Sequence, residues 1–157
     1  DHGYAAMVAS TTKLNTPGQA LSKLDAVHAL TDVTGFGLLG HLVEMTRPSG
    51  VDAVIDVAAL PILDGADATV ARGIVSSLAP DNVRLRRALR NLERAARHPL
   101  YPLLFDPQTS GGLLAAVAPE RASACVEALR RLGYRASTVI GEVLPVSGDA
   151  APIALRV

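Results

Sequence analysis

The chain has 157 residues, 49% of them hydrophobic, and its 15 basic and 15 acidic side chains give a formal net charge of +0. This length is enough for one domain with a substantial core, and the balanced charge gives no overall attraction to nucleic acid or to an anionic membrane. No apolar run approaches the roughly 20 residues of a transmembrane helix, and no secretory leader is recognisable. We therefore expect a cytoplasmic protein that binds neither nucleic acid nor a membrane.

Helical and extended patterns alternate along the chain. We predict helices over 4–13, 17–24, 36–47, 62–71, 81–97 and 119–132, and strands over 27–30, 51–57, 112–117, 136–143 and 153–157. The third helix is expected to stop at Pro48 and Gly50. Strands that alternate with helices predict an α/β (α+β) fold, with a mixed sheet covered by helices.

The segment 81–97 has the clearest helical periodicity, with leucines at positions 85, 89 and 92 on one face. Its other faces carry arginines at positions 84, 86, 87, 90, 94 and 97. A basic helix can bind nucleic acid or phosphate. No aromatic side chains are interleaved to stack on bases, so we favour a solvent-exposed face.

Residues 31–41, T-D-V-T-G-F-G-L-L-G-H, read as the end of a strand, a tight turn and the start of a helix. Asp32 stands at the end of the strand, where open sheets place ligands, and the glycines allow a sharp turn. A carboxylate beside backbone N–H groups suits a hard cation and phosphate oxygens. The alternative is that Asp32 caps the helix. We expect His41 to pack and hydrogen-bond locally.

Residues 106–114, D-P-Q-T-S-G-G-L-L, form a polar, glycine-rich loop that leads into an apolar strand. Thr109 and Ser110 offer hydroxyl groups, and Gly111 and Gly112 can expose consecutive N–H groups as a nest for an anion. The alternative is a purely structural turn. No lysine follows the glycines, so this is not a Walker loop.

The remaining candidate residues favour structural roles. Asp52 and Asp56 lie on the wetter face of their predicted strand and are expected to face water. His28 is expected in a buried strand, as a core or edge residue with its hydrogen bonds satisfied. The histidines show no zinc-type spacing. Cys125, the single cysteine, cannot form an internal disulfide and is expected to be a buried apolar residue of its helix.

Together, the two motifs resemble the C-terminal domain of the selenophosphate synthetases (selenide, water dikinases), which belong to the aminoimidazole ribonucleotide synthetase superfamily. The resemblance covers nearly the whole chain, because residues 10–15 and 141–143 also fit the family. It implies an α/β/α arrangement that is partly similar to the ferredoxin-like pattern.

The resemblance also implies an activity. The family uses ATP, selenide and water to make selenophosphate, AMP and phosphate, and it needs Mg²⁺. Asp32 matches a metal ligand of the family, and the loop Thr109, Ser110, Gly111 and Gly112 is the candidate cofactor-binding segment. The catalytic Cys or selenocysteine, its Lys partner and most ATP contacts belong to an N-terminal half that this chain lacks. Cys125 matches none of them, so no catalytic residue is assigned here.

We therefore expect residues 1–157 to form a single C-terminal domain of a longer enzyme that is a homodimer when full length. The fragment should fold alone but be inactive. The loop 108–112 should lie at the same end of the sheet as Asp32 and face the missing N-terminal domain. Two alternatives stay open: another ATP-dependent synthetase or kinase of the superfamily, and a non-catalytic dimerisation module.

Overall fold

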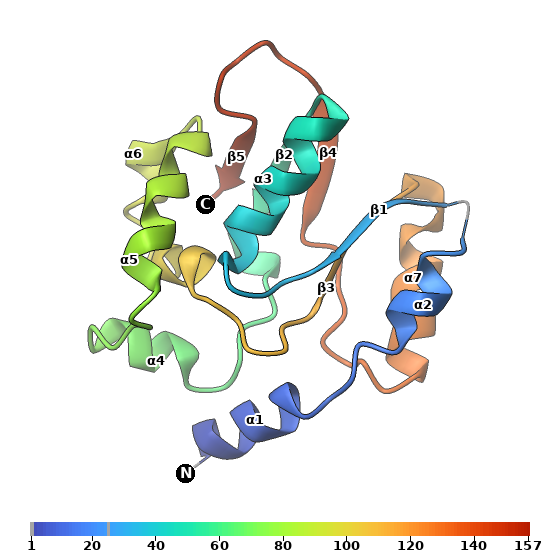
Figure 1. Cartoon of the computed structure of the whole chain (residues 1–157), viewed down its shortest axis with the longest axis horizontal. Helices are drawn as coiled ribbons and strands as arrows, with labels where there is room; N and C mark the ends of the chain where they lie inside the picture. The colour runs from blue at the N-terminus through green and yellow to red at the C-terminus, as the bar shows by residue number, and fades with distance from the viewer. Residues whose placement is uncertain (1, 25) are drawn as a thin grey trace.

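The computed structural model describes residues 2–24 and 26–157 (Figure 1). Its α-helices are α1 (His2–Thr11), α2 (Pro17–Leu21), α3 (Gly37–Ser49), α4 (Ala66–Ala71), α5 (Ala79–Asn82), α6 (Leu92–Ala95) and α7 (Pro119–Arg131). Short 3₁₀ helices are η1 (Val57–Ala59), η2 (Val83–Ala88) and η3 (Tyr101–Phe105). The strands are β1 (Val27–Asp32), β2 (Val51–Asp56), β3 (Leu113–Val117), β4 (Gly141–Pro145) and β5 (Ile153–Arg156).

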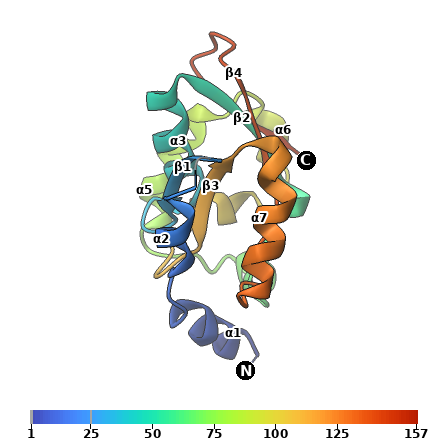
Figure 2. The ribbon, with the colours of Figure 1, turned by 90° about the vertical axis from the view of Figure 1, so that its right-hand side faces the viewer.

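The strands form two small sheets. In the first, β1 pairs antiparallel with β3, so that Asp32 lies opposite Leu113. In the second, the order is β4-β2-β5, with β2 antiparallel to β4 and parallel to β5. The predicted α/β class and the mixed pairing are confirmed, but the strands are divided between two sheets instead of one. In Figure 2, α2 and α7 lie on opposite sides of the β1–β3 pair.

Helix α3 connects the two sheets through the core. Leu39, Leu42 and Val43 are buried on it and belong to one cluster with Ile55 of β2 and Phe105 of η3. Such interdigitated aliphatic packing is what the low aromatic content requires. Helix α3 therefore holds the strand pair β1–β3, the segment η3 and the second sheet in a fixed relation.

The C-terminal end of α3 differs slightly from the prediction. Pro48 does not stop the helix but lies inside its last turn. The stop is Gly50, which takes a left-handed conformation with φ of 61° and donates its N–H to Arg47 and Thr46 oxygens. Within the described residues, no helix is long and apolar enough to cross a membrane.

The long helix predicted over 81–97 is wrong: this segment is divided into α5, η2 and α6. Leu89 is extended, with ψ of 122°, and forms a parallel bridge with Ile153. Arg90 N–H donates to the Ile153 carbonyl at 2.9 Å, and the Asn91 side chain both donates to and accepts from the Leu155 backbone. Pairing with the edge of β5 thus overrides the helical periodicity.

The prediction that Asp52 faces water is also wrong. Asp52 is 1% exposed, and its carboxylate accepts the Ser147 N–H at 2.8 Å and lies 3.2 Å from Arg90 Nη2. The pKa of Asp52 is lowered chiefly by hydrogen bonding from Ser147, against the effect of burial, with Arg90 adding to the lowering. The face of β2 that carries Asp52 is therefore covered by the loop between β4 and β5.

Three smaller predictions differ from the structure. His28, expected as a core or edge residue of a buried strand, is exposed beside an irregularity in the β1–β3 register, so it is an edge residue and its strand is not fully buried. Cys125 is only half-buried, because α7 buries none of its residues fully. The strand predicted over 136–143 begins at Gly141, where β4 starts to pair with β2.

Candidate functional site at the exit of β1

Asp32 is the last residue of β1, and its side chain is exposed. In the part of the chain that the structure describes, its carboxylate makes no hydrogen bond or ion pair. The capping alternative finds no support, because α3 begins at Gly37 behind Phe36, and no side chain caps it. The carboxylate is thus left available at the edge of the β1–β3 pair.

The glycine-rich loop lies at the same end of the β1–β3 pair as Asp32, as predicted. Val33 N–H donates to the Gly112 carbonyl at 2.8 Å, and Gln108 N–H donates to the Thr34 carbonyl at 3.0 Å. The antiparallel register already brings Asp32 opposite Leu113, the residue after the loop. Both motifs therefore meet at one edge of the molecule.

Gly111 makes this close approach possible. A Cβ atom at this position would lie 1.9 Å from the Val33 carbonyl oxygen, a distance that no real side chain tolerates. Asn15, in the third stretch that fits the family, donates its amide to the Gly111 carbonyl at 2.8 Å. Three segments distant in sequence are thus joined through one glycine.

The loop presents unused donors. Within the described residues, the structure gives none of the amide N–H groups of residues 109–112 an acceptor. Ser110 has a φ of 53°, the single left-handed non-glycine conformation in the same described part. Thr109, Ser110 and Gly112 are exposed. Neighbouring amides without acceptors beside a left-handed residue have the character of an anion nest.

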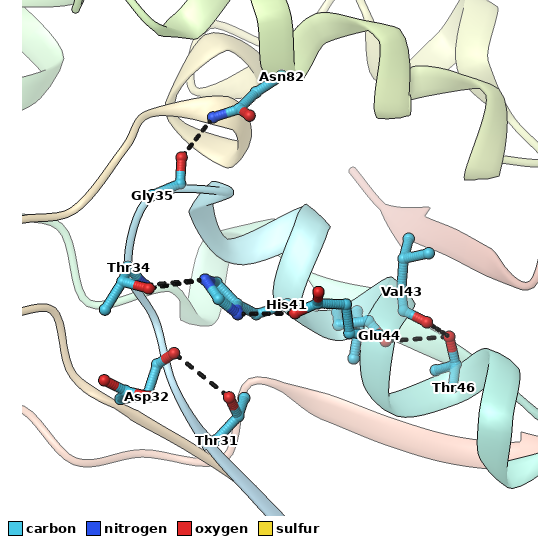
Figure 3. A network of polar contacts seen from close by, with 10 residues as sticks. Thr31, Asp32, Thr34, Gly35, His41, Val43, Glu44, Thr46 and Asn82 are labelled. Atoms are coloured by element: carbon cyan, nitrogen blue, oxygen red, sulfur yellow. Dashed lines mark hydrogen bonds and ion pairs between the residues drawn. The ribbon is translucent and has the colours of Figure 1, made fainter.

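His41 lies behind the turn and is 7% exposed. Its Nε2 accepts the Thr34 N–H at 3.0 Å and lies 3.2 Å from Thr34 Oγ1. On the other side of the ring, Nδ1 lies 3.2 Å from Glu44 Oε2 (Figure 3). The prediction that His41 packs and bonds locally is confirmed.

Asn82 is a buried polar residue that sequence reasoning missed. Its Nδ2 donates to the Gly35 carbonyl at 2.8 Å and to the Phe105 carbonyl at 3.0 Å. One amide group thus ties the turn after Asp32 to the segment that enters the second motif. No sequence signal pointed to it, because Asn82 lies in a segment with a helical pattern, far from both motifs in sequence.

Residues 5–152 match the family of AIR synthase related proteins, C-terminal domain. The chain belongs to this family. A selenide, water dikinase of Burkholderia pseudomallei (strain K96243) is 46% identical over 149 residues, which are 90% of this chain and 40% of that protein. A selenide, water dikinase of Pseudomonas straminea is 43% identical over 91% of this chain and 40% of that protein. The chain thus spans about two fifths of the length of these relatives.

A crystal structure of the hydrogenase maturation protein HypE in complex with ATP has the same fold. It superposes with a TM-score of 0.59 over 93% of this chain and 38% of that one, at 18% sequence identity. The architecture of an AIR synthase related C-terminal domain thus persists at low sequence identity. The superposition supports the predicted fold class.

A metal site in this family domain would be incomplete on the present chain alone. In the described residues, no group of three or more His, Cys, Asp or Glu side chains could hold a metal ion. Asp32 offers one exposed carboxylate, which is a ligand type that Mg²⁺ accepts. The donor chemistry of the described residues therefore fits at most one protein ligand of a Mg²⁺ ion at this place.

Asp106 opens the second motif but lies deeper than Asp32. It is half-buried, and this desolvation raises its pKa, while a hydrogen bond from the Ser76 backbone acts in the opposite direction. Its own carbonyl oxygen lies 3.0 Å from the position of a Cβ on Gly37, which has φ of 68°. Asp106 therefore belongs to the packing beneath the site, and Asp32 to its surface.

Proposed function

We propose that this chain is the C-terminal domain of a selenide, water dikinase, which forms selenophosphate from selenide and water with ATP and releases AMP and phosphate. The observation that carries the proposal is the identity of 41–46% to several such dikinases over about nine tenths of the chain. The Asp32 carboxylate and the amides of residues 109–112, which have no partner within the described residues, lie at the same end of the β1–β3 pair. This supports the proposal, because phosphoryl transfer depends on positioning and on stabilising phosphate charge.

In this proposal, each motif binds one part of the Mg²⁺–ATP complex. Asp32 holds Mg²⁺, and the amides of Thr109 to Gly112 donate hydrogen bonds to phosphate oxygens. Bound Mg²⁺ would neutralise phosphate charge during transfer. Mg²⁺ keeps few protein ligands and takes others from substrate phosphates, so a single carboxylate on this side is sufficient only when a second domain closes the site.

The proposal assigns the remaining parts of the active site to a further domain. An N-terminal domain of the same polypeptide would supply the further metal ligands, the catalytic Cys or selenocysteine and most ATP contacts. The full-length protein would be a cytoplasmic homodimer. Residues 1–157 would then be one domain whose motif edge faces the N-terminal domain.

The decisive test is selenide-dependent AMP formation by the full-length parent protein. Asp32→Asn keeps the shape of the side chain but removes the metal-binding charge, so we expect turnover to fall by about 100-fold or more. Asp64→Asn is the matched control, because Asp64 is also exposed and its carboxylate has no hydrogen bond or ion pair within the described residues. Near-normal turnover of Asp32→Asn would remove Asp32 from the site.

The isolated chain provides a second test. Catalysis by positioning fails when half of the groups are missing, so the purified 157 residues should release no AMP from ATP with selenide and Mg²⁺. Isothermal titration should likewise detect no tight Mg²⁺ binding. Selenide-dependent AMP release by this chain would show a complete active site and contradict the division between two domains.

A further inference from the structure

We propose that His41 is a positioning residue for this site: its neutral imidazole accepts the Thr34 N–H and thereby fixes the turn that orients Asp32. The inference rests on the proposed function, since it concerns the same carboxylate. It assigns a role to a side chain that touches neither metal nor nucleotide. The argument starts from the direction of one hydrogen bond.

A backbone N–H can only donate, so His41 Nε2 must be the acceptor in its 3.0 Å contact with Thr34 N. A neutral imidazole with an unprotonated Nε2 carries its proton on Nδ1. Nδ1 faces Glu44 Oε2 at 3.2 Å. The contact does not have hydrogen-bond geometry, so within the described residues Nδ1 has no hydrogen-bond partner. The Glu44 carboxylate beside it still favours, by its charge, the tautomer that keeps the proton on Nδ1 and leaves Nε2 free for Thr34.

The turn after Asp32 is held at backbone groups of three consecutive residues, 33–35. Main-chain partners from the second motif take the Val33 N–H and the Thr34 carbonyl. Side chains take two more groups: His41 accepts the Thr34 N–H, and Asn82 donates to the Gly35 carbonyl (Figure 3). Of the two side chains, His41 acts on the peptide group nearer to Asp32.

The burial of His41 makes this contact specific. An apolar side chain could fill the space of a ring that is 7% exposed and that packs against Phe36 with ring centroids 5.6 Å apart. It would leave the Thr34 N–H without its acceptor, and a polar group that loses its partner in a half-buried place destabilises its conformation. In this proposal, the turn at residues 33–35 would then also adopt a second conformation, in which the Asp32 carboxylate is displaced.

Three substitutions separate a positioning role from simple packing. His41→Gln places an amide oxygen at the level of Nε2, His41→Asn places it at the level of Nδ1, and His41→Leu offers no acceptor. In the full-length parent, His41→Leu and His41→Asn should raise the Mg²⁺ concentration for half-maximal activity by about 10-fold or more and lower kcat. His41→Gln should restore both values to within about 3-fold of wild type, and the KM for selenide should stay unchanged in all three.

A spectroscopic measurement tests the hydrogen bond independently of activity. The ¹⁵N shifts of the His41 ring in the 157-residue chain, assigned by comparison with His41→Gln, should show a neutral ring protonated on Nδ1. A ring protonated on Nε2 would overturn the inference. So would three variants with wild-type Mg²⁺ dependence in an active parent, even if all three melt at lower temperature. A wild-type parent without dikinase activity would instead refute the proposed function.

Discussion

Two aspartates in strands of this molecule have opposite environments. Asp32 ends β1 and is exposed, and within the described residues its carboxylate has no hydrogen-bond or ion-pair partner. Asp52 is the second residue of β2, is 1% exposed, and its carboxylate meets both Ser147 N–H and Arg90. A buried charge persists only when it is paired and hydrogen-bonded. An exposed carboxylate without a partner in the described residues has no such structural necessity. The comparison therefore separates a residue that is available for binding from one that the fold requires.

The surroundings of the two aspartates are also built by different means; we call the exit of β1 the first edge and the start of β2, with the β4–β5 loop over it, the second edge. At the exit of β1, the chain is held by close backbone contact, with Gly111 against the Val33 carbonyl. At the start of β2, the loop from β4 to β5 is held by side-chain charge, through Asp52 and Arg90. The first edge should therefore be sensitive to added volume, and the second to lost charge.

The largest effect on stability is expected at the first edge. Gly111→Ala adds a Cβ that would lie 1.9 Å from the Val33 oxygen, so the two motifs must separate. We expect a loss of about 3 kcal/mol in the free energy of unfolding, at the upper end of the cost of overpacking. The measurement is urea unfolding followed by circular dichroism.

Gly112→Ala is the matched control. A Cβ at this neighbouring glycine meets nothing within 4 Å, and its φ is not positive. Its unfolding midpoint should stay close to that of the wild type. Equal losses for the two variants would show that the close approach of the loops does not depend on Gly111.

The first edge is built from local signals, and for this reason the sequence alone could predict it. The strand–turn–helix at Asp32 and the loop at 106–112 were predictable, because glycines, a terminal carboxylate and apolar flanks are local signals. That the two loops would meet followed from their position at strand ends. The fold class followed from the alternation of strands and helices.

Long-range partners explain the errors. Asp52 looked solvated because alternation alone cannot show that Arg90 and the loop carrying Ser147 cover it. The helix predicted over 81–97 failed because Leu89 and Arg90 find backbone partners at Ile153, more than 60 residues away. Asn82 was missed for the same reason, since both of its acceptors lie in other segments.

Loss of charge at the second edge should give the next largest loss of stability. Asp52→Asn keeps the shape but leaves the Arg90 guanidinium without its counter-charge, so the urea midpoint should fall clearly. Asp32→Asn removes no contact within the described residues, so its midpoint should match the wild type. If both variants shift the midpoint equally, the comparison between a structural and an available carboxylate fails.

The stability that Asp52 contributes should depend on pH. The pKa of Asp52 is lowered in the folded chain, so the folded state binds fewer protons there than the unfolded state. The stability that this carboxylate contributes is present above its ordinary pKa and is lost as the pH falls through the lowered value. Unfolding midpoints measured from pH 7 down to pH 2 should therefore fall less steeply in Asp52→Asn than in the wild type.

The smallest effect is expected at Asp106, and its sign is opposite. Desolvation raises the pKa of this half-buried carboxyl, so the folded state holds a proton that the unfolded state has already released. Between the ordinary pKa and the raised value, stability therefore falls as the pH rises.

Asp106→Asn removes the charge whose burial is unfavourable. Its urea unfolding midpoint at pH 7 should be unchanged or slightly higher than that of the wild type, and this part of the pH dependence should disappear. A marked loss of stability at pH 7 would instead show that the charged form makes a contact, such as the one with the Ser76 N–H, that outweighs its desolvation. In that case Asp106 would join Asp52 as a carboxylate that the fold requires in its charged form.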